Sequence, residues 1–124
     1  MRLISCHIEN FGKLSDFSCE FSGGLNIICE DNGWGKSTFA AFIRAMFYGL
    51  DGDRKKNLLE NERKKYRPWQ GGVFGGQLVF EIKGKQYEVS RIFHDREQAD
   101  EFELRDVKTN LPSGDYSKKI GEEI

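Results

Sequence analysis

The sequence predicts an α/β fold in which a mixed sheet with an antiparallel β-meander packs against one central helix. Two patterns predict it. Apolar and polar residues alternate in several short segments, which is typical of strands, and apolar residues between positions 39 and 47 recur every three or four residues, which is typical of a helix. A chain of 124 residues has room for one core, so we expect one domain or one lobe of a larger unit, and not two independent cores.

The first half of the predicted sheet comes from three segments. Residues 2–10 alternate, with Leu3 on the polar face, and residues 14–21 alternate less cleanly after a turn at 11–13. A further strand is predicted over 25–29, because this short and mostly apolar run is typical of a strand buried on both faces.

The central helix has the clearest pattern in the chain. Its apolar residues form a broad stripe, which we assign to the core. Gly49 is a suitable C-terminal stop, because glycine readily adopts the left-handed conformation that ends many helices. The stripe consists of Phe39, Phe42, Ile43, Met46 and Phe47.

Alternating segments in the second half of the chain predict the antiparallel β-meander. Residues 77–82 and 86–93 alternate and are joined by a short glycine-containing turn, which indicates a hairpin. A third strand is predicted over 102–107. Residues 117–124 are typical of the first turns of a helix, and because the pattern is unfinished there, we expect the domain to continue beyond residue 124.

A glycine-rich segment between the strand at 25–29 and the helix is typical of a phosphate-binding loop. Unpaired N–H groups at the start of a helix, together with the helix dipole, favour an anion. Lys36 supplies positive charge for the β- and γ-phosphates, the Ser37 hydroxyl is a ligand for Mg²⁺, and Thr38 can donate near the α-phosphate. The predicted cofactors are therefore ATP and Mg²⁺. The predicted nucleotide-binding residues are Asn32, Gly33, Trp34, Gly35, Lys36, Ser37 and Thr38.

The loop departs from the strict pattern G-x-x-x-x-G-K-[ST] at its first position, where Glu30 replaces glycine. A carboxylate there lies near the triphosphate, so we expect affinity to be weakened about tenfold, or about 1.4 kcal/mol. Calorimetry should show Glu30→Gly binding Mg-ATP more tightly than the parent, and equal or tighter binding by the parent contradicts this. A glycine-rich turn that only caps the helix is the alternative interpretation of the segment.

Several motifs carry a resemblance to a known family. The most specific are Asn10-Phe11-Gly12, the glycine-rich loop, and Phe47-Tyr48-Gly49 at the predicted helix end. Together they resemble the N-terminal ATPase lobe of SMC-like proteins, and most closely the YhaN-like and SbcC-like coiled-coil ATPases. The later segment Tyr66-Arg67-Pro68-Trp69 is also similar to the YhaN-like branch.

This resemblance implies an ABC-type ATPase head, split by a long coiled coil, in which two heads enclose two ATP molecules. It implies DNA, a second ATPase half, a dimer mate and a nuclease subunit as partners in DNA repair, recombination or chromosome maintenance. It also places Gly12 and Lys13 near the base and ribose. With the resemblance, we expect residues 1–124 to be a single partial domain, one lobe of a split head, and the rest of the ATPase to lie beyond residue 124. The water-activating Asp-Glu pair of the family has no counterpart at the end of an apolar strand here, so we expect no catalytic residue and no ATP turnover within this chain.

The segment 51–70 is a predicted mobile and basic insert. Residues 54–67 contain seven basic and two acidic residues, and this excess of positive charge favours contact with a DNA backbone, with Tyr66 and Trp69 available to stack on bases. A solvated surface insert is the alternative. The nucleic-acid candidates are Lys55, Lys56, Lys64, Lys65 and Trp69.

The remaining charged and thiol residues predict no further chemistry. The net charge of −1 excludes a uniformly basic nucleic-acid binder, and the acidic segment 94–106 is typical of a charged link between strands. His7 and His94 lack partners at metal-ligand spacing. Widely spaced cysteines and the absence of a membrane-length apolar run predict a cytoplasmic protein that does not enter a membrane.

The sequence is also compatible with two other functions. One is a non-hydrolysing nucleic-acid-binding module whose phosphate loop has decayed. The other is the ATPase lobe of an ABC transporter, although the chain has Asn10-Phe11-Gly12 where such proteins often carry an aromatic lead-in with proline and glycine.

Overall fold

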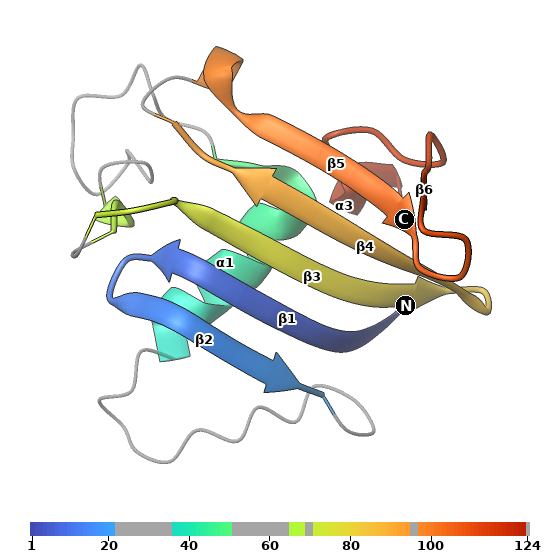
Figure 1. Cartoon of the computed structure of the whole chain (residues 1–124), viewed down its shortest axis with the longest axis horizontal. Helices are drawn as coiled ribbons and strands as arrows, with labels where there is room; N and C mark the ends of the chain where they lie inside the picture. The colour runs from blue at the N-terminus through green and yellow to red at the C-terminus, as the bar shows by residue number, and fades with distance from the viewer. Residues whose placement is uncertain (22–35, 51–64, 69–70, 95–96, 124) are drawn as a thin grey trace.

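Figure 1 shows the computed structural model of the chain, which describes residues 1–21, 36–50, 65–68, 71–94 and 97–123. The strand predicted over 25–29 lies outside these residues. The described elements are β1 (Arg2–Phe11), β2 (Leu14–Glu20), α1 (Lys36–Tyr48), β3 (Gly75–Ile82), β4 (Lys85–Ile92), a short 3₁₀ helix η1 (Glu97–Ala99), β5 (Glu101–Asp106), β6 (Leu111–Pro112) and α3 (Ile120–Glu123).

The strands form one sheet in the order β2-β1-β3-β4-β5-β6. Every pairing among the described residues is antiparallel. The hairpin of β1 and β2 is joined to the β3-β4-β5 meander by the pairing of β1 with β3. The predicted meander is therefore observed, whereas a mixed sheet depends on the strand at 25–29.

Strand β1 departs from the simple alternation that its sequence predicts. Alternation places Leu3 on the polar face, but the residue is buried together with Cys6 and Ile8. The pairing of β1 with β3 shifts register between Leu3 and Ser5, and such an irregularity changes which face the following side chains occupy. Burial raises the pKa of the Cys6 thiol to about 12, and neither Cys6 nor Cys19 is part of a disulfide.

Helix α1 crosses one face of the sheet, where it buries its apolar stripe (Figure 1). Phe39, Phe42 and Met46 have no exposed surface. The helix ends at the expected position, because the N–H of Gly49 donates to the carbonyl of Ala45 at 2.7 Å and Gly49 has a φ of +79°. This is the left-handed C-terminal cap for which glycine is favoured.

A buried arginine donates a hydrogen bond to a carbonyl group in the last turn of this helix. The Nε of Arg91, on β4, donates to the carbonyl of Met46 at 2.9 Å, and its guanidinium also donates to the carbonyl of Lys118. The same group lies over the ring of Phe102, 4.7 Å from the ring centroid. Burial lowers the pKa of Arg91 to about 10, so the side chain still carries its charge at neutral pH beside the negative end of the helix dipole.

Candidate functional site

The turn between β1 and β2 carries two of the residues predicted to contact nucleotide. Gly12 has a φ of +59°, which glycine adopts without strain, and its N–H donates to the carbonyl of Tyr66 at 2.7 Å. Lys13, the next residue, is exposed. The turn is therefore tied by its backbone to a segment far along the chain.

The same turn lies against the start of α1. A Cβ atom placed on Gly12 would lie 3.1 Å from Cγ2 of Thr38 and 3.6 Å from Cδ1 of Tyr66. A separation of 3.1 Å is tighter than nine in ten real Cβ contacts, so any larger residue here would require Thr38 to shift by a few tenths of an ångström. The structure thus brings together Gly12, which the family resemblance places near the base end, and Thr38, which the loop motif places near the α-phosphate.

The first turn of α1 favours an anion. Its leading N–H groups have no partner within the helix, and the turn carries no acidic residue to compete for them. Lys36 and Ser37 are the first two residues of α1. Their side chains, Glu30 and the loop residues Asn32, Gly33, Trp34 and Gly35 lie outside the described part of the structure.

Tyr66 has a different role from the one its sequence context suggests. The sequence predicts a side chain available for stacking on a nucleic-acid base, but the residue is 9% exposed and its ring stacks on Phe11, with centroids 4.9 Å apart. That prediction is wrong, because the ring is used inside the core. Lys65 is exposed and its Nζ lies 5.2 Å from the centroid of the Tyr66 ring. Lys55, Lys56, Lys64 and Trp69 lie outside the described residues.

Asn10 ties the same region to the segment before β3. Its Nδ2 donates to the carbonyl of Val73 at 2.9 Å, and its Oδ1 accepts from the hydroxyl of Ser15 at 2.8 Å. A hollow of about 330 Å³ lies beside this junction. It is lined by Arg67, Pro68, Gly71, Gly72, Phe74, Phe93 and His94.

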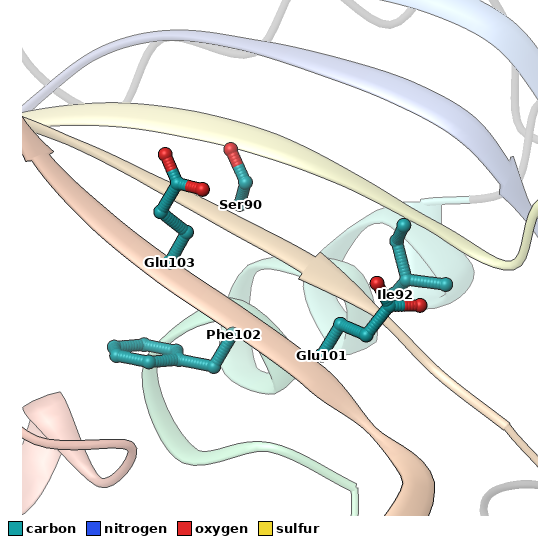
Figure 2. Close-up of a pocket in the computed structure, with 5 residues that line it drawn as sticks. All are labelled: Ser90, Ile92, Glu101, Phe102 and Glu103. Carbon is teal, nitrogen blue, oxygen red and sulfur yellow. The ribbon is translucent and has the colours of Figure 1, made fainter. Parts of the chain in front are cut away.

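A second hollow, of about 380 Å³, lies over β4 and β5. Figure 2 shows that the carboxylates of Glu101 and Glu103 lie on the same side of the sheet as Ser90 and Ile92. Both carboxylates have basic partners. His94 Nε2 lies 3.0 Å from Glu101, and Arg105 pairs with Glu103. Among the described residues, no group of three or more His, Cys, Asp and Glu side chains is arranged to hold a metal ion.

Sequence reasoning missed a polar cluster at the other end of β4. Lys85 Nζ lies 2.8 Å from Asp115 and 3.4 Å from Asp106, and the hydroxyl of Tyr87 donates to Asp115 at 2.6 Å. Hydrogen bonds from Lys85 and Tyr87 hold the pKa of Asp115 below its usual value. Burial, followed by the Asp115 carboxylate, raises the pKa of Tyr87 to about 12. No spacing in the sequence brings these residues together, because they meet through strand pairing and a later loop.

The sequence of this chain matches one protein family and is similar to two known proteins. A family described as AAA domain matches residues 5–124. The uncharacterized protein YhaN of Bacillus subtilis is 31% identical over 121 residues, which cover 97% of this chain and 11% of YhaN. The DNA double-strand break repair Rad50 ATPase of Archaeoglobus fulgidus is 35% identical over 84 residues, 68% of this chain and 9% of that protein. The chain therefore spans about a tenth of the length of either relative.

Among the described residues, no helix is both long and apolar enough to cross a bilayer.

Proposed function

Because this chain belongs to the AAA domain family, we propose that it is the ATP-binding N-terminal lobe of an SMC-like ATPase head. The resemblance to the YhaN-like branch that its motifs predict is confirmed by the match to YhaN over nearly the whole chain. The name of the Rad50 relative supports a role for the whole protein in DNA repair or chromosome maintenance. DNA, a second ATPase half, a dimer mate and a nuclease subunit are the partners that we propose for that whole protein.

One observation carries the nucleotide-binding proposal: Gly12 and Thr38 meet at the start of α1. A nucleotide whose phosphates lie at the first turn of α1 would have its base end beside the Gly12-Lys13 turn. We assign Lys36 to the β- and γ-phosphates and Ser37 to Mg²⁺, with the backbone from Asn32 onward enclosing the phosphates.

We propose that the 124-residue chain binds ATP without hydrolysing it. Phosphoryl transfer to water needs a residue that orients and activates the water. Asp100 and Glu101 form an Asp-Glu pair at the start of a strand, but both already have partners. Asp100 Oδ1 accepts from the N–H of His94 at 2.9 Å, and Glu101 pairs with the His94 ring. Neither carboxylate belongs to the proposed nucleotide site.

Tryptophan fluorescence tests the proposal. The chain has two tryptophans, so Trp69→Phe leaves Trp34, in the predicted phosphate loop, as the only reporter. We expect Mg-ATP to change its emission and Lys36→Ala in the same background to abolish the change, because the ammonium group of the loop lysine reaches the terminal phosphates. Arg44→Ala, on the same helix but away from its first turn, is the matched control.

A fluorescence signal that Mg-ATP leaves unchanged, together with no heat of binding in calorimetry, would reject nucleotide binding. That result would favour the non-hydrolysing nucleic-acid-binding module. Phosphate release from Mg-ATP by the purified chain, at a rate that Lys36→Ala reduces, would reject the proposal that the chain does not hydrolyse ATP.

A further inference from the structure

Tyr66, in the segment 65–68, lies beside both parts of the structure that contribute to the proposed nucleotide site. The carbonyl of Tyr66 accepts from the N–H of Gly12, and the Tyr66 ring is within contact distance of the position that a Cβ on Gly12 would occupy. The side chain of Thr38, at the start of α1, also lies within contact distance of that Cβ position. Three segments distant in the sequence therefore meet at Gly12.

The ring of Tyr66 fixes this segment in the fold. It stacks on Phe11 with an interplanar angle of 22°, and Phe11 itself has no exposed surface and contacts Phe42 on α1, with ring centroids 5.5 Å apart. Phe11 directly precedes Gly12. The backbone carbonyl that receives the Gly12 N–H is thus held by a ring packed against the residue next to it.

The turn is also held by a contact outside its own hairpin. Pairing of Phe11 with Leu14 fixes the two ends of this two-residue loop, and the positive φ of Gly12 is one that glycine adopts without strain. The hydrogen bond from Gly12 to Tyr66 is a tertiary contact that adds to this pairing and holds the tip of the hairpin against Thr38.

We propose that Tyr66 is a positioning residue that holds the Gly12-Lys13 turn against the start of α1 and thereby sets the affinity of the site for the base and ribose of ATP. The inference rests on the proposed function. It assigns Tyr66 no contact with the phosphates, which are left to the loop and the first turn of α1. Loss of Tyr66 should therefore weaken ATP binding and leave the binding of inorganic tripolyphosphate, which has no base or ribose, unaffected.

Calorimetry of the full 124-residue chain with Mg-ATP and with Mg-tripolyphosphate tests this division. For Tyr66→Leu we expect about tenfold weaker binding of ATP, because a loosened turn must be ordered at each binding event, and no change for tripolyphosphate. Tyr66→Phe keeps the stacked ring and should restore the affinity of the parent for ATP.

Phe74→Leu is the matched control. Phe74 is also 9% exposed and also contacts the Phe11 ring, at 5.5 Å between centroids, so its replacement should disturb the core to a similar extent. We expect it to leave the ratio of the two affinities unchanged. An equal loss of ATP and tripolyphosphate binding in Tyr66→Leu, or the same change of ratio in Phe74→Leu, would overturn the inference.

Amide exchange in the parent chain gives a second test that no folding defect can obscure. We expect ATP, but not tripolyphosphate, to slow exchange of the Gly12 amide, since only ATP reaches the turn. Equal exchange at Gly12 with both ligands would reject the role of the turn and of Tyr66. Failure of the parent to bind either ligand would instead reject the proposed function, and the inference with it.

Discussion

At the scale of single residues, Arg91 connects β4 to the end of α1, to the segment before α3 and to β5, and no pattern in the sequence predicts these contacts. Its guanidinium contacts the carbonyls of Met46 and Lys118 and the ring of Phe102. The signal was present in the strand alternation, which places Arg91 on the same face as Tyr87 and Val89. Alternation alone predicts a buried arginine there but cannot name the carbonyls that satisfy it.

Replacing Arg91 tests the value of these contacts. We expect Arg91→Met to lower the free energy of unfolding by about 1–3 kcal/mol, because buried carbonyl acceptors lose a charged donor while the apolar stem is kept. Urea unfolding at pH 7 measures this. Arg105→Met, at a half-exposed arginine paired with Glu103, is the control and should cost less than about 1 kcal/mol. Equal losses in both variants would contradict the capping role of Arg91.

Asp115 predicts a dependence of stability on pH. Its pKa is lower in the folded chain than the value of about 3.9 expected when unfolded, so the unfolded state binds the proton more readily. Its contribution to stability is therefore fully present above about pH 4 and is lost as the pH falls through the lower folded value. We expect Asp115→Asn to be less stable than the parent at pH 7, with the difference shrinking between pH 4 and pH 2.

Thermal unfolding followed by circular dichroism over this pH range measures the effect. Asp16→Asn is the control, because the side chain of Asp16 is 93% exposed. A difference between parent and Asp115→Asn that stays constant from pH 7 to pH 2 would show that the carboxylate of Asp115 contributes through packing and not through its charge.

At the scale of elements, the helix was the most predictable part. Its stripe repeats over three turns, and the sheet buries that stripe as the period requires. Phe42 lies at its centre, fully buried and in an edge-to-face contact with Phe11.

We expect Phe42→Ala to lower the free energy of unfolding by about 3–5 kcal/mol, because it removes a large buried ring and leaves a cavity. Urea unfolding measures the loss. Ile43→Ala, at a half-buried neighbour on the same helix, should cost clearly less. A larger loss for Ile43→Ala would mean that the helix face is assigned wrongly.

The described strands other than β6 were predictable to within about two residues at each end, as was the meander of β3, β4 and β5, but the pairing of β1 with β3 was not. The sequence predicts β3 from residue 77, whereas it begins at Gly75. Glycines are weak strand signals, yet a Cβ on Gly76 would lie 2.3 Å from the carbonyl oxygen of His7, so the close pairing with β1 requires glycine. Strand β6, with two residues, is too short to show any period.

The candidate site was predictable only in part. The proposed role of Lys36, Ser37 and Thr38 follows from a motif, and the role proposed for Gly12 follows from a family resemblance. The proximity of Gly12 to Thr38 could not be predicted, because it depends on how α1 crosses the sheet. Tyr66 was missed for a related reason: its flanking lysines suggested a solvated segment, and only the tertiary structure reveals the aromatic partner, Phe11.

At the scale of the whole molecule, a net charge near zero conceals an uneven distribution. The sheet face opposite α1 carries carboxylates on β3, β4 and β5, including Glu81, Glu88, Glu101 and Glu103. Three of them have basic partners, because Arg2 pairs with Glu81, His94 with Glu101 and Arg105 with Glu103. Residues 54–67 instead carry an excess of positive charge, with seven basic and two acidic residues, so any DNA binding by this chain is expected at that segment.

Replacing Lys55, Lys56, Lys64 and Lys65 with glutamine tests that expectation. We expect weaker binding of duplex DNA and a shallower dependence on salt, by about 0.9 in the logarithmic slope for each phosphate that the variant no longer neutralises. Fluorescence anisotropy at several salt concentrations measures both. The control removes the same charge elsewhere, at Lys83, Lys108, Lys118 and Lys119. Unchanged affinity and slope in the first variant would leave the segment as a solvated insert.

The cap on α1 also bears on how this chain folds during synthesis. The last turn of α1 contains no basic residue of its own, and its cationic partner, Arg91, lies 45 residues beyond Met46 along the chain. At translation rates of about 5–20 residues per second, the helix waits several seconds for that partner to emerge from the ribosome. Until β4 has paired, the nascent helix carries an uncompensated negative end. The helix and the later hairpin are thus expected to become stable together, so that nascent chains halted before residue 91 should lack protected α1 amides.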